Sequence, residues 1–320
     1  MGPVQPLVSI TCPTYNHEKF IAQTLDGFVM QQTDFPFEII VHDDASTDHT
    51  VAVLKEYEEK YPNLFANIYQ SENQFSKGHD RVTKITFAAA RGKYIALCEG
   101  DDYWTDPYKL QKQVDFLEAN PDYSICCTNA YYIKESNHFA LLENDIFIDR
   151  DKPAKTIEQD DLLYQNCILT LTAVFRNTGK SLAPWIERVD LGDWSIHILN
   201  SFSGRIKYLA DITAAYRKHD KGIFSMQGDK KQLISYIKTG EIIRENIPQP
   251  LAQKMIAGQR ARLRELLRAY KQEQSSRLFL KYFRRYAHIL SFGDKIRYSF
   301  TLLILLIKRS LVKIKNVFSK

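Results

Sequence analysis

The sequence predicts an α/β fold: a mostly parallel, Rossmann-like sheet flanked by helices, followed by a helical, basic, amphipathic C-terminal extension. Three observations support this fold class. Short apolar runs alternate with helix-periodic segments over the first 130 residues, three of these runs end in polar clusters, and residues 277–320 are strongly basic. A chain with 44% hydrophobic and 25% charged residues is typical of a folded globular protein.

The first half of the chain alternates between the two kinds of segment. Apolar runs predict strands at 8–12, 37–41, 64–69, 94–98 and 123–128. Between them, apolar residues at helical spacing predict helices over 17–31, after Asp48, over 80–91 and over 107–119. Short strand–helix connections imply a sheet that is mostly parallel and covered on both faces.

The second half is less regular, and the sequence divides it into two parts. After a polar stretch over 130–165, a strand is expected at 169–175, a helix from Leu191 to Phe202, and short strands at 206–209 and 214–217. From about Lys230 the chain becomes helical. We therefore predict one domain over 1–228, in two halves that divide at about residue 130, and a helical region over 229–320.

Two adjacent carboxylates, Asp101 and Asp102, close the strand-like run 94–98. Neighbouring carboxylates repel each other at the end of a buried strand, and a divalent cation removes that repulsion. Mg²⁺ and Mn²⁺ prefer such oxygen ligands and fill the rest of their shell with phosphate oxygens and water. The alternative is an acidic turn that caps the helix beginning near Pro107, since Asp is favoured at caps and turns.

Polar clusters also follow two other predicted strands. Thr14-Tyr15-Asn16 ends the first strand and Asp43-Asp44 ends the second. In parallel α/β sheets, ligands bind outside the carboxyl ends of the strands. Three polar strand ends at one edge of a sheet therefore predict a single binding site.

These segments resemble the family 2 glycosyltransferases, which share the GT-A fold. The resemblance runs from Val8 to about Ser225 and is carried by Val8–Asn16, by Ile40–Asp48 and by Gly92–Trp104, in this order and at this spacing. It implies an inverting enzyme that depends on a nucleotide sugar, with a nucleotide-binding half to about residue 130 and an acceptor half over 131–228. Gly192-Asp193-Trp194 and Tyr216-Arg217-Lys218-His219 fit the acceptor half of the family pattern less specifically.

The resemblance also implies roles for individual residues. Thr14 and Tyr15 would lie along the nucleobase, Asp44 would accept the imide N–H of a uracil or thymine, and Asp101 would lie near the ribose. Asp102 would bind the Mn²⁺ or Mg²⁺ ion that bridges the diphosphate. A UDP-sugar is the expected donor, although dTDP fits the same contact.

Two further residues match family positions in the acceptor half. Asp193 would be the general base that takes the proton from the acceptor hydroxyl. His219 would meet the metal or the diphosphate. The alternatives are a helix N-cap ahead of Trp194 for Asp193, and a surface histidine in a charged loop for His219.

The basic tail is a separate feature. Residues 277–320 contain eleven Lys or Arg and one acid, Asp294, and they surround the apolar run Phe300–Ile307. That run is too short to span a bilayer, which takes about 20 apolar residues. Cations around an apolar helix face are typical of helices that lie on an anionic membrane. A helix packed on the body of the protein and nucleic-acid binding are the alternatives; no nucleic-acid reader module accompanies the charge, so we expect no nucleic-acid partner.

Cysteine usage and the N-terminal sequence bear on location. The five cysteines form no CxxC pair, which favours reduced thiols in a reducing compartment, and the N-terminus lacks the pattern of a secretory signal. We expect a cytoplasmic protein at the inner face of the cytoplasmic membrane, acting on a glycan or lipid-linked glycan acceptor of the cell surface. The competing functions are a catalytically degenerate membrane-associated partner protein and a nucleotidyltransferase; Pro13-Thr14-Tyr15-Asn16 in place of a glycine-rich phosphate loop argues against the latter.

Overall fold

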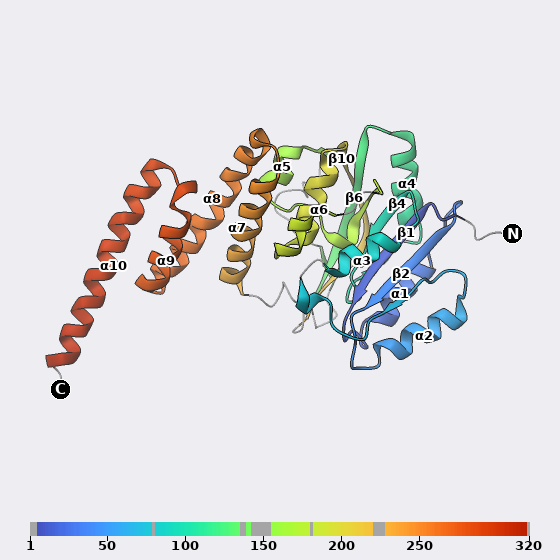
Figure 1. The fold of residues 1–320 in the computed structure, drawn as a ribbon, viewed down its shortest axis with the longest axis horizontal. Helices are drawn as coiled ribbons and strands as arrows, with labels where there is room; N and C mark the ends of the chain where they lie inside the picture. The colour runs from blue at the N-terminus through green and yellow to red at the C-terminus, as the bar shows by residue number, and fades with distance from the viewer. Residues whose placement is uncertain are drawn as a thin grey trace. The chain divides into compact units, whose positions relative to one another are not determined.

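The computed structural model describes residues 5–78, 81–134, 139–141, 155–179, 182–219 and 228–318. The chain forms two compact units, Met1–Gly222 and Ile223–Lys320 (Figure 1). The sequence-based boundary between residues 228 and 229 stays a prediction, since residues 220–227 lie outside the described residues.

The first unit is built on one sheet. Its main path runs β3 (Ile68–Tyr69), β2 (Phe37–Asp43), β1 (Val8–Thr14), β4 (Tyr94–Leu97), β9 (Ala173–Arg176), β6 (Tyr123–Lys134), β10 (Arg205–Lys218) and β5 (Tyr103–Trp104), with β7 (Phe139–Leu141) on β6 and β8 (Lys155–Ile157) on β10. Strands β3, β2, β1 and β4 are parallel. Strand β9 runs antiparallel to both β4 and β6, and β6 is parallel to β10. The α/β fold class is confirmed, and the sheet is mixed beyond β4.

Helices cover this sheet. They are α1 (Ile21–Val29), α2 (Thr50–Lys60), α3 (Arg81–Ala89), α4 (Lys109–Ala119), α5 (Gln159–Tyr164) and α6 (Gly192–Ser201), with short 3₁₀ turns η1 (Phe75–Lys77), η2 (Thr170–Thr172) and η3 (Pro184–Arg188). Nearly every residue of β1 is buried, as expected where helices cover both faces of a parallel strand. Apolar side chains of β1, β2 and β4 share one core with Phe28 of α1, Leu54 of α2 and Leu110 of α4.

The sequence pattern gave wrong bounds for three strands, β3, β9 and β10. Strand β3 contains only Ile68 and Tyr69 of the run expected over 64–69, and the run expected over 169–175 begins as η2 and becomes β9. The two short strands expected at 206–209 and 214–217 are one strand, β10, whose register against β6 shifts between Tyr208 and Ile212. The polar residues between them interrupt the apolar pattern, and the pairing with β6 is irregular there, but the strand continues to Lys218. Asp211 in this stretch is exposed and forms an ion pair with Lys112.

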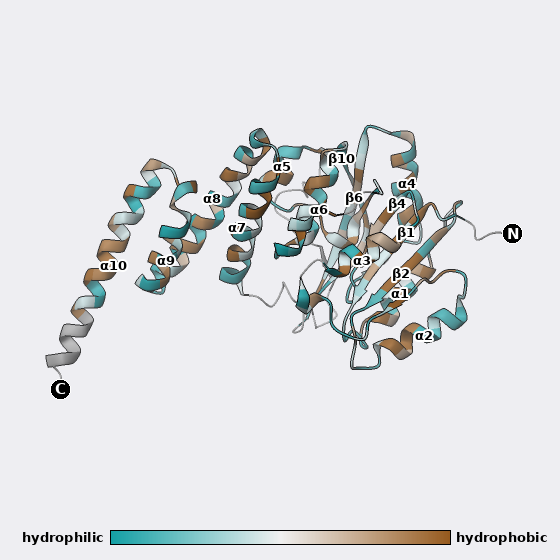
Figure 2. Cartoon of the chain, in the orientation of Figure 1, coloured by the Kyte–Doolittle hydropathy of each residue, from teal (hydrophilic) through white to brown (hydrophobic). Residues whose placement is uncertain are grey.

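The second unit is helical, as the sequence predicts. It contains α7 (Asp229–Asn246), α8 (Gln249–Gln272), α9 (Ser276–Tyr286), η4 (Ala287–Ile289) and α10 (Phe292–Phe318). Its core joins Leu263 and Leu267 of α8 to Phe279 of α9 and to Tyr298 and Leu305 of α10. Figure 2 shows apolar residues recurring along α10 between hydrophilic turns. Among the described residues, no helix has both the length and the apolar character needed to cross a membrane.

Candidate active site

The carboxyl ends of β1, β2 and β4 meet at one edge of the sheet. Parallel pairing sets Thr14 beside Asp43, and the backbone N–H of Asp44 donates to the carbonyl oxygen of Thr14 at 3.0 Å. The chain after β4 follows the same edge, since the N–H of Gly100 donates to the carbonyl oxygen of Pro13 at 2.9 Å. The three polar strand ends therefore lie together.

Gly100 allows this close approach. A Cβ at this position would lie 2.6 Å from Oγ1 of Thr14 and 2.8 Å from Nδ1 of His17. A side chain here would therefore force the loop Glu99–Asp102 away from the end of β1. Thr14 is buried, and its Oγ1 has no hydrogen-bond partner among the described residues. The Tyr15 side chain is 44% exposed, so it has an accessible aromatic face at this edge.

Asp44 is buried behind this edge and holds the next loop. Its carboxylate accepts the backbone N–H of Gln74 at 2.6 Å and that of Phe75 at 3.0 Å, at the start of η1. An ionised carboxylate has about four lone-pair positions, so the two that are occupied leave capacity for another donor. The contact of Asp44 with a pyrimidine imide stays a prediction. The structure shows that Asp44 also holds the backbone of Gln74 and Phe75, which the sequence did not reveal.

Glu99, Asp101 and Asp102 form an acidic cluster, in which one carboxylate oxygen of each lies within 4.8 Å of the others. Desolvation, followed by the charges of Asp101 and Asp193, raises the pKa of Glu99 to about 8. Glu99 is not among the site residues that the sequence predicts. The available signal was its position two residues before Asp101 and three residues before the predicted metal ligand Asp102.

Asp102 is the buried member of this cluster. One carboxylate oxygen accepts the backbone N–H of Arg217 at 2.8 Å, while the other, Oδ2, is buried without a partner among the described residues. Burial, together with the charges of Asp101 and Glu99, raises the pKa of Asp102 well above its ordinary value. A buried carboxylate oxygen that lacks a partner and faces two other carboxylates fits a hard divalent cation, and Asp102 is the best-placed residue to hold one.

Asp101 is bonded to the histidine that the sequence assigned to the metal. Nε2 of His219 lies 2.9 Å from Oδ2 of Asp101, and Nε2 of His17 lies 3.9 Å from the same oxygen. Burial acts to raise the pKa of Asp101, but the hydrogen bond from His219 and the charges of both histidines outweigh it, and the net shift is downward. The expected metal-binding role of His219 and the ribose contact of Asp101 both stay predictions.

Arg217 links β10 to the loop Glu99–Asp102, a role that the sequence does not predict. Besides its backbone bond to Asp102, its guanidinium donates to the carbonyl oxygen of Asp101 at 2.6 Å and to Oε1 of Gln23. It also lies 4.4 Å from the ring centroid of Tyr103, which pairs with β10 through β5. Burial lowers the pKa of Arg217, with the nearby anionic groups opposing the shift.

Asp193 lies in the first turn of α6, whose N-cap is Leu191, so the N-cap alternative for Asp193 is wrong. Its Oδ2 accepts hydrogen bonds from Nδ2 of Asn166 at 2.8 Å and Oγ1 of Thr170 at 3.2 Å, and its Oδ1 accepts the N–H of Trp194 at 2.7 Å. The carboxylate is partly exposed and close enough to Glu99 to raise that residue's pKa. These contacts fix the orientation of a carboxylate beside the acidic cluster.

His197 lies one helical turn after Asp193 and is fully buried. Neither ring nitrogen has a hydrogen-bond partner among the described residues. Burial lowers its pKa to about 4, and the charge of Asp193 opposes that shift only in part. The sequence presents His197 as one polar position of an amphipathic helix, without a signal for this environment.

Comparisons with known proteins identify the family and the fold. The family model for glycosyl transferase family 2 matches residues 9–179. An uncharacterised protein of Mycobacterium tuberculosis is 39% identical over 68% of this chain and 60% of its own length, so the matched region spans less than two thirds of that relative. The UDP-Glc:alpha-D-GlcNAc-diphosphoundecaprenol beta-1,3-glucosyltransferase WfaP of Escherichia coli is 27% identical over 67% of this chain and 78% of WfaP.

A solved structure shares the fold. S. aureus TarS in complex with UDP-GlcNAc superimposes with a TM-score of 0.65 at 17% identity, covering 89% of this chain and 81% of that chain. The family match covers more than half of the chain and contains the β1, β2 and β4 strand ends. The chain belongs to the family 2 glycosyltransferases and has a GT-A fold.

Proposed function

We propose that this glycosyltransferase moves a sugar from a UDP-sugar to a hydroxyl of a glycan or lipid-linked glycan, with inversion at the anomeric carbon and with help from Mn²⁺ or Mg²⁺. The observation that carries the proposal is the partnerless, buried Oδ2 of Asp102 inside the acidic cluster, at the sheet edge where Thr14 and Tyr15 also lie. When bound there, a divalent cation neutralises charge that develops on the leaving diphosphate.

Donor binding uses the edge formed by β1 and β2. The exposed ring of Tyr15 stacks on the base, which gives affinity without selecting a base. Asp44 selects a pyrimidine by accepting its imide N–H with the lone pairs that Gln74 and Phe75 leave open. Asp101, held by His219, contacts the ribose.

Asp193 acts as the general base that removes the proton from the acceptor hydroxyl. Three donors fix its carboxylate, so no reorientation is needed when it accepts the proton of the acceptor hydroxyl. As the proton leaves, the acceptor oxygen attacks the anomeric carbon on the side opposite the diphosphate, which inverts its configuration. Positioned proton transfer of this kind contributes roughly 10²–10⁴-fold to the rate.

We further propose that the protein is cytoplasmic and docks on an anionic membrane surface through α10. Among the exposed large apolar side chains of this helix, seven form one face: Phe292, Ile296, Phe300, Leu303, Ile304, Ile307 and Leu311. At about 100° per residue they fall within an arc of roughly 120°, and the buried Tyr298 and Leu305 lie on the opposite side. Arg297 and Lys308 both lie just beyond one edge of the apolar arc, where lipid headgroups would neutralise them.

One face of α10 packs against α8 and α9, so the alternative of a packed helix applies to that face. Membrane docking would use the other, exposed face. Because WfaP is named for a diphosphoundecaprenol substrate, a lipid-linked acceptor is the acceptor class that this surface would suit. The alternative of a degenerate partner protein is disfavoured by the presence of Asp102 and Asp193 with their supporting contacts.

The test is calorimetric titration of the full chain with UDP, dTDP and GDP, each with Mn²⁺ and again with EDTA. We expect UDP to bind only when metal is present. The Asp102→Asn variant, which keeps the side-chain shape but loses the charge, should lose metal-dependent binding by at least tenfold while remaining folded by circular dichroism.

Two outcomes would contradict the proposal. Equal UDP binding in Mn²⁺ and EDTA would remove the metal from donor binding. A folded chain that binds none of the three nucleotides would favour the degenerate partner protein.

A further inference from the structure

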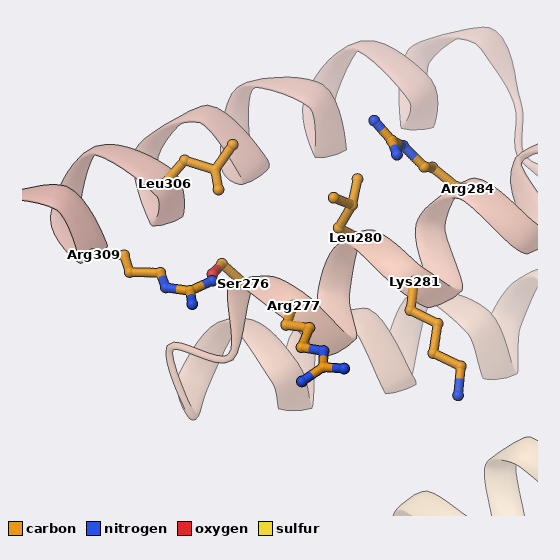
Figure 3. Close-up of a pocket in the computed structure, with 7 residues that line it drawn as sticks. All are labelled: Ser276, Arg277, Leu280, Lys281, Arg284, Leu306 and Arg309. Carbon is orange, nitrogen blue, oxygen red and sulfur yellow. The ribbon is translucent and has the colours of Figure 1, made fainter.

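A groove of about 360 Å³ lies between α9 and α10 in the second unit. Figure 3 shows Leu280 of α9 and Leu306 of α10 facing each other across it, with Arg284 near one end and Arg309 close to Ser276 at the other. The groove thus combines an apolar middle with guanidinium groups at its ends.

Its charge is positive and uncompensated. No carboxylate lines the groove, and Arg284 and Arg309 form no ion pair within the described part of the chain. Asp294, the one acid of residues 277–320, is already bound by Arg264 of α8 at 2.7 Å. Arg277 and Lys281 also line the groove, but Figure 3 shows their side chains directed away from the two leucines. An anionic ligand would therefore meet Arg284 or Arg309 first.

The groove borders the exposed apolar face of α10. Leu306 is exposed and, at about 100° per residue, lies roughly 60° around the helix from Leu303 of that face and on the side toward α9. A molecule with an apolar chain that lay along Leu303 could therefore continue over Leu306 into the groove and end at an arginine.

We propose that this groove binds one membrane lipid through its phosphate group. The guanidinium of Arg284 or Arg309 holds the phosphate oxygens, for which its planar fork of N–H donors is suited. The acyl chain lies over Leu280 and Leu306, where it loses contact with water. A free phosphate ion would leave both leucines uncovered, which is why the structure favours a lipid. This inference rests on the proposed membrane docking and adds a defined site to it.

The experiment uses a lipid that is soluble as single molecules. Dihexanoyl phosphatidic acid, below its critical micelle concentration, is titrated into the full-length chain by calorimetry, and inorganic phosphate is titrated in parallel. We expect the lipid to bind at least tenfold more tightly than phosphate. Arg284→Gln with Arg309→Gln should weaken lipid binding at least tenfold, and Arg284→Lys with Arg309→Lys should restore part of it.

The matched control is Lys295→Gln with Arg297→Gln, which removes the same charge from α10 outside the groove. It should leave binding of the single lipid molecule within twofold, while weakening flotation with phosphatidylglycerol vesicles.

Three results would overturn the proposal: phosphate binding as tightly as the lipid, the two glutamine pairs having equal effects, or no lipid binding by a folded chain. UDP titration of each variant with Mn²⁺ separates this site from the nucleotide site, because all four substituted positions belong to the second unit.

Discussion

At the scale of single residues, three hydrogen-bond donors hold the carboxylate of Asp193, the proposed base, in position. Asn166 and Thr170 come from the segment between α5 and β9, whereas Trp194 is the next residue of α6. Two separate parts of the chain therefore fix one carboxylate, and the loss of a donor should affect turnover more than donor binding.

Asp193→Asn should lower kcat by roughly 10²–10⁴-fold, because an amide cannot take the proton of the acceptor hydroxyl. UDP binding by calorimetry should stay within about twofold of wild type. Asn166→Ala is the companion variant: we expect a smaller fall in kcat, since Asp193 keeps its charge and two of its three donors. Unchanged turnover in Asp193→Asn would remove it as the base.

His197 makes stability sensitive to acid. Its pKa is about 4 in the folded chain and 6.5 ordinarily, so below pH 6.5 the unfolded chain takes up a proton that the folded chain refuses. The stability that neutral His197 provides is complete above pH 6.5 and is lost as the pH falls toward 4. Between pH 6.5 and 5, at about 1.4 kcal/mol per pH unit, the expected loss is about 2 kcal/mol.

Urea unfolding of the wild type and of His197→Phe over this pH range measures the effect. The variant keeps a ring of similar size and cannot titrate, so its stability should fall less steeply than that of the wild type. Parallel pH profiles would show that His197 is protonated equally in the folded and unfolded chains.

At the scale of elements, α10 has two apolar faces: one is buried in the core of the second unit, and the other is exposed and is proposed to dock on a membrane. Phe300→Ser with Ile304→Ser should weaken binding to phosphatidylglycerol vesicles at least tenfold, because each of these side chains contributes roughly 1.5–3 kcal/mol when it leaves water. The melting temperature should not fall, since both side chains are exposed.

Leu278→Ser on α9 is the control for this pair, because Leu278 is exposed but lies outside the apolar face of α10. Vesicle flotation compares the three proteins. Equal flotation of the double variant and wild type would contradict the docking role of this face.

The arrangement of the helices and strands also explains which features of the fold and of the site can be predicted from the sequence. The turns after β1, β2 and β4 are local patterns, and parallel pairing brings them to one edge. The positions of Glu99 and Arg217 in the site depend on contacts between residues that are far apart in the sequence. Arg217 reaches Asp102 only because β10 pairs with β5 and β6. No local pattern marks that β9 runs antiparallel between β4 and β6, so these relationships were beyond sequence reasoning.

At the scale of the whole molecule, the two units have separate cores. Removing residues 277–320 would take away Phe279, Tyr286 and Tyr298, and would expose Leu263 and Leu267 of α8 to water. We therefore expect the shortened chain to lose the cooperative unfolding of the second unit while metal-dependent UDP binding persists. Differential scanning calorimetry and nucleotide titration measure the two effects; loss of both would show that the first unit depends on the tail.

The apolar outer face of α10 has a practical consequence for work in solution. In water without lipid, Phe292 is 79% exposed, and its neighbours on that face are also uncovered. The same surface that would enter a bilayer is then available to a second copy of the chain, and self-association competes with lipid for it. Apparent vesicle affinity should consequently depend on protein concentration, so titrations belong at the lowest concentration that the detector allows.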